Sequence, residues 1–161
     1  MRGLLIILLW FVFYIHSVNA ESADSILIEK SKRRLTLLKN DKKVAQYSIS
    51  LGGVPIGPKQ CQGDNKTPEG DYLISGRNPN SSFYRSLKVS YPNELDRKNA
   101  SRLGCMPGGD IMIHGLPNGR GWLGILHRLF NWTRGCIAVK DSEIDEIWHL
   151  VPDGARVRIV P

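Results

Sequence analysis

The sequence predicts a mostly β domain with two or three short helices. Three observations support this class: apolar residues recur at or near period two, glycine-containing turns separate these runs, and only short segments have helical spacing. Residues 21–161 are long enough to form one compact domain with its own core.

The first twenty residues have the composition of a signal peptide. Arg2 supplies a positive charge, residues 3–15 are almost entirely apolar, and Val18-Asn19-Ala20 is a small-x-small cleavage site. The apolar run is shorter than the roughly 20 residues that cross a bilayer, and an uncleaved anchor is the alternative. We therefore expect residues 1–20 to direct export and residues 21–161 to form the mature domain.

Alternating apolar residues predict two or three antiparallel strands between residues 26 and 51, with a turn at residues 39–42. A rigid glycine-rich loop follows at residues 52–59, and a long polar turn at residues 63–70 leads into the next strand. The later strands are expected at residues 71–74, around Leu87, Val89 and Tyr91, at residues 111–114 and 136–139, and at residues 156–160.

Three segments are predicted to be helical. Residues 93–103 have Asn93 at the N-cap and Gly104 just past the end. The segment Asn118–Phe130 reads as an insertion whose apolar part is either a lid over a site or a short helix that plugs one end of a barrel. Ser142-Glu143-Ile144-Asp145 has the arrangement of a capping box, and the apolar stripe that follows is assigned to core packing.

The net charge of +7 is spread over scattered Lys and Arg residues. This pattern allows attraction to a polyanion, but a solvated surface is the favoured interpretation. No aromatic residues interleave with the basic ones as they do on a nucleic-acid platform, so we expect no nucleic-acid partner. A monomer without a cofactor is the expectation.

The chain has three cysteines, an odd number for an exported protein. Cys61 and Cys105 lie in loop-like sequence and could form a disulfide, which would leave Cys136 free; sequence alone cannot decide this. A free thiol in an oxidising compartment is easily damaged, so its presence favours a use for it. The alternative is a buried, inert cysteine.

His114 and Cys136 have the same local setting, an apolar β-prone run beside a glycine. A thiol is a strong nucleophile only as the thiolate, and a nearby imidazole commonly removes its proton. We therefore expect this pair to be catalytic and Cys136 to be alkylated rapidly near pH 7. A zinc site using both residues is disfavoured because no close-spaced ligand pair exists, so no metal is expected.

Four blocks of sequence occur in a fixed order: Pro55-Ile56-Gly57-Pro58-Lys59, Gly63-Asp64 with Thr67-Pro68-Glu69-Gly70-Asp71-Tyr72, Ile113-His114-Gly115, and Gly135-Cys136-Ile137-Ala138-Val139. Together they resemble the signature of the YkuD-type L,D-transpeptidase catalytic domain. One block alone would be a weak signal, but four in the right order are specific, and the resemblance covers essentially the whole mature chain. It implies a single-domain β-sandwich or barrel-like fold in the bacterial periplasm or cell envelope.

Carried over by motif, the resemblance implies that Cys136 is the nucleophile and His114 the base. The reaction would be acyl transfer on peptidoglycan stem peptides through a thioacyl-enzyme. Gly135 would let the chain present its own amide and that of Cys136 to the oxyanion. The Gly115 carbonyl would orient the His114 ring.

The sequence departs from the family pattern where Arg134 stands in place of a frequent second histidine. Arginine cannot act as a base near neutral pH, so a role for a second imidazole is in doubt. Arg134 is expected either to bind substrate carboxylates or to form a structural salt bridge. Thr133 and Trp132 either shape the substrate cleft or simply pack.

Two other functions stay open at this point. The same thioester could be hydrolysed, which would make the protein an L,D-carboxypeptidase or an endopeptidase that releases a lipoprotein attached to peptidoglycan. An envelope lipoprotein would then be a partner beside the stem peptides. The protein could instead be a non-enzymatic envelope-binding module with a structural cysteine.

Overall fold

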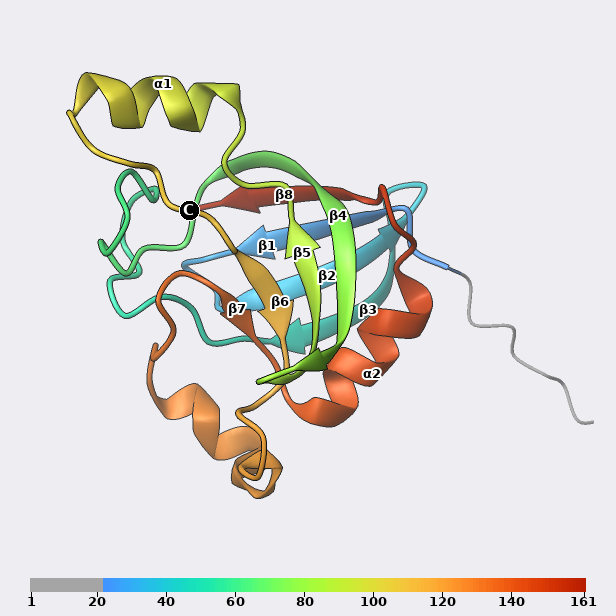
Figure 1. Cartoon of the computed structure of the whole chain (residues 1–161). Helices are drawn as coiled ribbons and strands as arrows, with labels where there is room; N and C mark the ends of the chain where they lie inside the picture. Colours follow the sequence, from blue (N-terminus) through green and yellow to red (C-terminus); the bar gives the residue numbers. More distant parts are fainter. Residues whose placement is uncertain (1–21) are drawn as a thin grey trace, which may run out of the picture.

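The computed structural model describes residues 22–161; the predicted signal peptide, residues 1–20, lies outside them. In this part of the chain eight strands form a continuous curved sheet in the order β3-β2-β1-β8-β4-β5-β6-β7 (Figure 1). The pairs β1–β8 and β6–β7 are parallel and the other neighbours antiparallel. The elements are β1 (Ser25–Glu29), β2 (Arg34–Lys39), β3 (Lys42–Ser48), β4 (Gly70–Ser81), β5 (Tyr84–Val89), α1 (Glu94–Arg102), β6 (Met112–His114), the 3₁₀ segment η1 (Gly121–Leu129), β7 (Ile137–Ala138), α2 (Asp141–Leu150) and β8 (Arg156–Val160).

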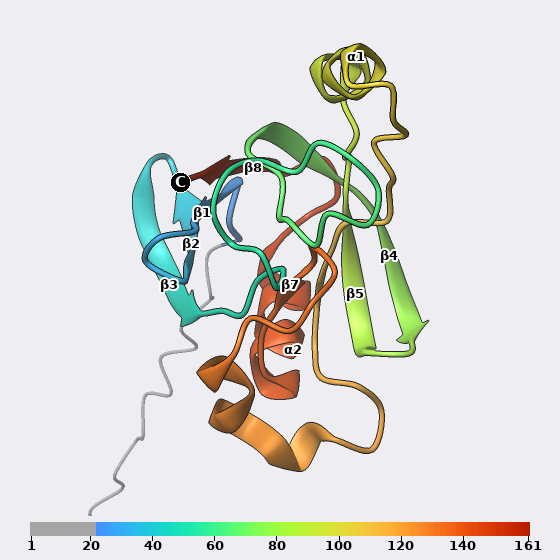
Figure 2. The same ribbon diagram turned by 90° about the vertical axis from the view of Figure 1, so that its left-hand side faces the viewer.

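The two edges of the sheet approach each other and nearly close a barrel. The amide of Ser50, just after β3, donates to the Ala138 carbonyl at 2.9 Å, and the Ala138 amide donates back at 2.9 Å. A second bridge joins Gly52 to Thr133. As a result β1–β3 and β4–β6 face each other across one core (Figure 2). The predicted mostly β, sandwich- or barrel-like domain with three helical segments is confirmed.

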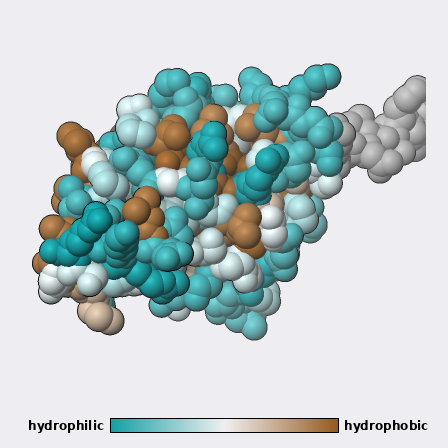
Figure 3. Space-filling model, turned by 90° about the horizontal axis from the view of Figure 1, so that it is seen from above, coloured by the Kyte–Doolittle hydropathy of each residue, from teal (hydrophilic) through white to brown (hydrophobic). Residues whose placement is uncertain are grey.

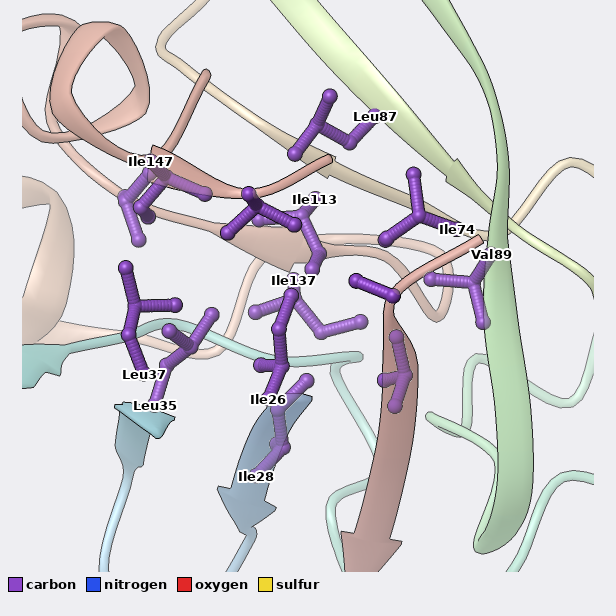
Figure 4. Close-up of a cluster of buried hydrophobic side chains, with 14 of the residues drawn as sticks. Ile26, Ile28, Leu35, Leu37, Ile74, Leu87, Val89, Ile113, Ile137 and Ile147 are labelled. Carbon is purple, nitrogen blue, oxygen red and sulfur yellow. The ribbon is translucent and has the colours of Figure 1, made fainter. Parts of the chain in front are cut away.

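The period-two pattern of β1 and β2 places their alternating apolar side chains in this core, and β3 adds the buried Tyr47. Ile26, Ile28, Leu35 and Leu37 are fully or almost fully buried, and they meet side chains of β4–β7 and of α2 (Figure 4). Every member of the core lies between Ala23 and Ile159. The described part of the chain, residues 22–161, thus contains an eight-stranded sheet, three helical segments and a shared core.

Helix α1 begins and ends as predicted. The Asn93 side chain accepts from the Asp96 amide at 3.0 Å, Asp96 accepts from the Asn93 amide, and Gly104 follows the end with φ +69°. The predicted start of α2 at Ser142 is wrong, because Lys140 is the N-cap. Glu143, not Asp145, closes the capping box by accepting from the Lys140 amide at 3.0 Å.

Strand β4 is longer than residues 71–74. Its second half is polar and pairs with β5 as the outer arm of a hairpin, where no buried apolar pattern marks it. Tyr91, which was expected in the strand of Leu87 and Val89, lies beyond the end of β5 and is buried.

The apolar part of the inserted segment forms η1, kinked at Gly124, and it projects from the sheet at the end of the molecule opposite α1 (Figures 1 and 2). The core cluster includes none of its residues, so a plug in the barrel end is wrong. None of the helices within residues 22–161 combines the length and apolarity that a membrane span needs.

Candidate active site

Parallel pairing of β6 and β7 brings the predicted nucleophile and base together. Ile113 lies opposite Ile137, and both point into the core. Cys136 immediately precedes β7 and lies beside Met112, while His114 lies two residues further along β6. Because side chains alternate, His114 and Cys136 take the face away from the core, at a diagonal spacing that side chains can bridge.

The His114 ring is fixed by packing and by one hydrogen bond. It is only 4% exposed, its centroid lies 4.6 Å from that of Phe83 and 5.8 Å from that of Trp132. Nδ1 lies 2.7 Å from the Gly115 carbonyl oxygen, so Nδ1 carries the proton and Nε2 is left as the basic nitrogen. Burial lowers the pKa of His114, and the Gly115 hydrogen bond opposes this only in part. The imidazole is therefore neutral at pH 7.

Cys136 is a free, half-buried thiol. Its Sγ accepts from the Met112 amide at 3.4 Å and donates to the Asp110 carbonyl at 3.4 Å. Burial raises the pKa of Cys136, and the Met112 amide offsets this only in part. The resting pair is thus a neutral thiol beside a neutral imidazole, so the rapid alkylation expected near pH 7 does not follow from this geometry.

The turn before Cys136 depends on Gly135 and Thr133. Gly135 has φ +124°, and a Cβ there would lie 2.5 Å from the Lys66 carbonyl oxygen, so only glycine fits. The Thr133 hydroxyl donates to the Cys136 carbonyl at 2.7 Å and accepts from the Gly135 amide at 3.2 Å. The Gly135 amide, predicted as an oxyanion donor, is already engaged in this arrangement. The Cys136 amide has no acceptor within residues 22–161 and stays available.

The other two predicted substrate residues differ in their surroundings. Trp132 is half-buried and packs edge-on against the His114 ring, so it forms a wall of the site. Arg134 is exposed and makes no ion pair with any described residue, which leaves its guanidinium free for a substrate carboxylate.

The first two signature blocks form a loop that supports the cysteine turn. Lys30, 2% exposed, donates to the carbonyls of Gly57 and Thr67 at 2.7 and 3.0 Å and to the Glu69 carboxylate at 2.8 Å. Within the loop, Lys59 pairs with Asp64 at 2.8 Å. This network holds the Lys66 carbonyl against Gly135, so these blocks act as structural support rather than as reacting groups.

The predicted disulfide is present. Cys61 and Cys105 are bonded with a Cα–Cα separation of 5.7 Å, and Cys136 is left free. The bond joins the signature loop to the segment that runs from α1 into β6. Both segments border the cysteine turn, since the second one carries Asp110 and Met112.

Two hollows lie away from the thiol. A groove of about 660 Å³ over β1, β8 and β4 has no cysteine or histidine in its lining. A second groove of about 360 Å³ adjoins Trp132 and runs along η1; its lining is mainly apolar. His127 lies in its wall, 6% exposed, and burial lowers its pKa to about 4.

Sequence reasoning missed three contributors to the site. The backbone groups of Asp110 and Met112 contact the thiol, and Phe83 packs on the imidazole. Backbone contacts have no sequence signal. Phe83 lies in the turn between β4 and β5, a hairpin that the polar sequence concealed.

Comparison with known proteins identifies a family. The sequence profile of YkuD, the L,D-transpeptidase catalytic domain, matches residues 23–159. "Putative L,D-transpeptidase YafK" of Escherichia coli K12 is 34% identical over 111 residues, which are 68% of this chain and 35% of that protein.

Solved structures show the same fold. The helical cell shape determining protein Pgp2 from Campylobacter jejuni matches with a TM-score of 0.65 and 27% identity, over 86% of this chain and 48% of that one. An L,D-transpeptidase from Xylanimonas cellulosilytica matches with a TM-score of 0.54 and 16% identity, over 88% and 62%. The chain thus spans less than half the length of YafK and Pgp2.

Proposed function

The chain belongs to the YkuD family of L,D-transpeptidase catalytic domains, and we propose that it transfers acyl groups of peptidoglycan stem peptides through a thioester on Cys136. The observation that carries this proposal is the pairing of β6 with β7, which puts a free thiol and an oriented, neutral imidazole on one face. Family membership supports an enzyme of this class.

The first half-reaction uses the neutral pair. The Cys136 thiol turns from the Asp110 carbonyl toward His114 and gives its proton to Nε2 as Sγ attacks the carbonyl carbon of the third stem residue. The Cys136 amide donates to the oxyanion, a contribution typically worth about 3 kcal/mol or more. The intermediate collapses, and the amine of the terminal D-alanine leaves with the proton from His114.

The second half-reaction decides the product class. An amine from a second stem peptide attacks the thioester, His114 accepts its proton, and the returning thiol is reprotonated. Arg134 holds a substrate carboxylate in both steps, and Trp132 forms one wall. If water replaces the amine, the same residues hydrolyse the bond. Residues 1–20 direct the protein to the periplasm or cell envelope, where an envelope lipoprotein is a further candidate substrate.

The test is product analysis by mass spectrometry. The protein is incubated with purified stem tetrapeptide, with and without an amine acceptor, beside the Cys136→Ala protein. We expect cross-linked dimers and free D-alanine from the wild type and neither from Cys136→Ala. Trimmed monomers without dimers would assign hydrolysis. If the protein leaves both the stem peptides and intact peptidoglycan unchanged, a binding module is favoured. Fractionation of cells that make the full chain checks the export.

A further inference from the structure

Five large apolar side chains of η1 and the residue after it lie on the surface. Their exposed fractions run from 53% to 77%. Residues 111–130 contribute no other large apolar side chain that is this exposed. We call the set the apolar ridge; it consists of Trp122, Ile125, Leu126, Leu129 and Phe130.

The side chains of η1 are oriented in the opposite sense to those of an ordinary surface helix. His127 is 6% exposed, with Nδ1 3.2 Å from the Ser50 hydroxyl, and both Glu143 carboxylate oxygens accept from Arg128 at 2.6 Å. The polar side chains therefore face the domain while the apolar ones face solvent, the reverse of an ordinary surface helix. A contiguous exposed apolar patch of this kind marks an interaction site.

The ridge is held in place and projects outward. The Arg128–Glu143 pair ties it to α2, and the segment extends from the sheet at the end opposite α1 (Figures 1 and 2). By contrast, the face seen from above is largely hydrophilic with hydrophobic residues scattered over it (Figure 3). The 360 Å³ groove runs between the ridge and Trp132.

Both signs of charge lie near the ridge: the Asp141 carboxylate of α2 adjoins Gly121 and accepts from the Leu116 amide at 2.8 Å, whereas the segment that carries the ridge has only cations. From Ile111 to Lys140 the sequence has three Arg and one Lys and no Asp or Glu. The nearby Glu143 is already paired with Arg128 and Lys140, and Arg120 is exposed with no ion-pair partner in the described chain. Aromatic and leucine side chains with adjacent free cations are the combination that binds the interface of an anionic bilayer.

We propose that the apolar ridge inserts shallowly into the interface of a membrane that contains anionic phospholipid, with Arg120 among the headgroup phosphates. A partner protein or a second copy would need apolar complementarity but would not account for the exposed Arg120, which has no ion-pair partner among the described residues. Binding would hold the thiol site close to the membrane surface. The inference is independent of the reaction assigned to Cys136.

Vesicle flotation tests it on residues 22–161, which contain the described sheet, helices and core and lack the apolar N-terminal run. The protein, with Cys136→Ala to exclude chemistry, is mixed with vesicles of phosphatidylglycerol and phosphatidylcholine or of phosphatidylcholine alone. We expect flotation with the anionic vesicles, a blue shift of the Trp122 emission, and a loss of at least about tenfold in partitioning for Trp122→Ser with Phe130→Ser. Arg120→Gln should lower partitioning about fivefold.

The matched control removes apolar side chains elsewhere. Leu95 and Met106, 62% and 72% exposed, lie in and just after α1, and Leu95→Ser with Met106→Ser should float like the parent. Thermal unfolding checks that each variant is folded. The proposal is overturned if the parent does not float, if the ridge variant floats equally well, or if both vesicle types bind equally. A dimer that the ridge variant disperses, without flotation, would assign the ridge to a second copy.

Discussion

The Cys136 sulfur lies 3.4 Å from the carbonyl oxygen of Asp110, an acceptor that stabilises the S–H form and disfavours the thiolate. This contact and the burial of the side chain act in the same direction, since burial raises the pKa of Cys136. The Cys136 thiol is therefore neutral at rest, and in the proposed mechanism it loses its proton as it attacks the substrate.

Alkylation of Cys136 should reflect this resting state. We expect iodoacetamide to label Cys136 more slowly at neutral pH than a free thiol with a pKa of about 8.5, and the rate to rise only at higher pH. Peptide mass analysis of unreduced protein measures this, with Cys61 and Cys105 unlabelled. Rapid labelling that does not change with pH across the neutral range would contradict the neutral pair.

The acid limb of the pH dependence of kcat/KM should lie at low pH. Because burial lowers the pKa of His114, the imidazole stays neutral and able to accept a proton as pH falls past about 6.5, its ordinary pKa. We expect kcat/KM to decline only below that value. His114→Ala should lower kcat/KM about 10² to 10⁴-fold, whereas His149→Ala, at an exposed position in α2, should leave it unchanged.

Gly135→Ala should damage both the fold and the activity. The positive φ and the 2.5 Å approach to the Lys66 carbonyl leave no room for a Cβ, and strain of this kind costs about 1–3 kcal/mol. Gly109→Ala is the matched control, because a Cβ there meets nothing within 4 Å. Urea unfolding of both proteins measures the difference, and equal midpoints would refute the steric argument.

Lys30→Met should be far more destabilising than Lys32→Met. Lys30 is buried on three acceptors, and removing it strands the Glu69 carboxylate, a loss of about 3–5 kcal/mol in the free energy of unfolding. Lys32 pairs with Glu29 at an exposed position, where solvent screens the pair and its loss changes stability little. Denaturant curves of the two variants should separate clearly.

Arg134→Gln should weaken substrate binding without stopping the chemistry. A charged hydrogen bond to a carboxylate is worth about 1.5–3 kcal/mol, so we expect KM for stem peptides to rise about ten- to a hundredfold with kcat little changed. Arg97→Gln, exposed on α1, is the control. An unchanged KM for Arg134→Gln would remove this residue from the substrate site.

Much of the fold could be predicted because the alternating apolar residues of β1 and β2 are buried, although in β3 only Tyr47 is fully covered. The second half of β4 was not predicted, because this arm of the hairpin is polar and buries few apolar side chains. The apolar composition of η1 was plain, but periodicity does not say which face is covered. His127 and Arg128 turn inward there only because Ser50 and Glu143, distant in sequence, supply their partners.

The same distinction holds in the site. The types and order of His114 and Cys136 were evident from their glycine-flanked runs, and register then placed them together. The sequence could not predict the protonation state of this pair, because the pKa of the thiol depends on burial and on backbone groups of residues 110–112. The engagement of the Gly135 amide by Thr133 is likewise a matter of local geometry.

The bond between Cys61 and Cys105 makes maturation of the site depend on the surrounding redox chemistry. In a glutathione-rich interior these two sulfurs would stay apart, and the strands of chain that flank the thiol would be tied only by weaker contacts. An oxidising exterior locks them while Cys136, which has no partner in the described chain, keeps its sulfur available. If the chain is exported as we propose, this bond would form only after export, and the two segments beside the Cys136 turn would be joined covalently from then on.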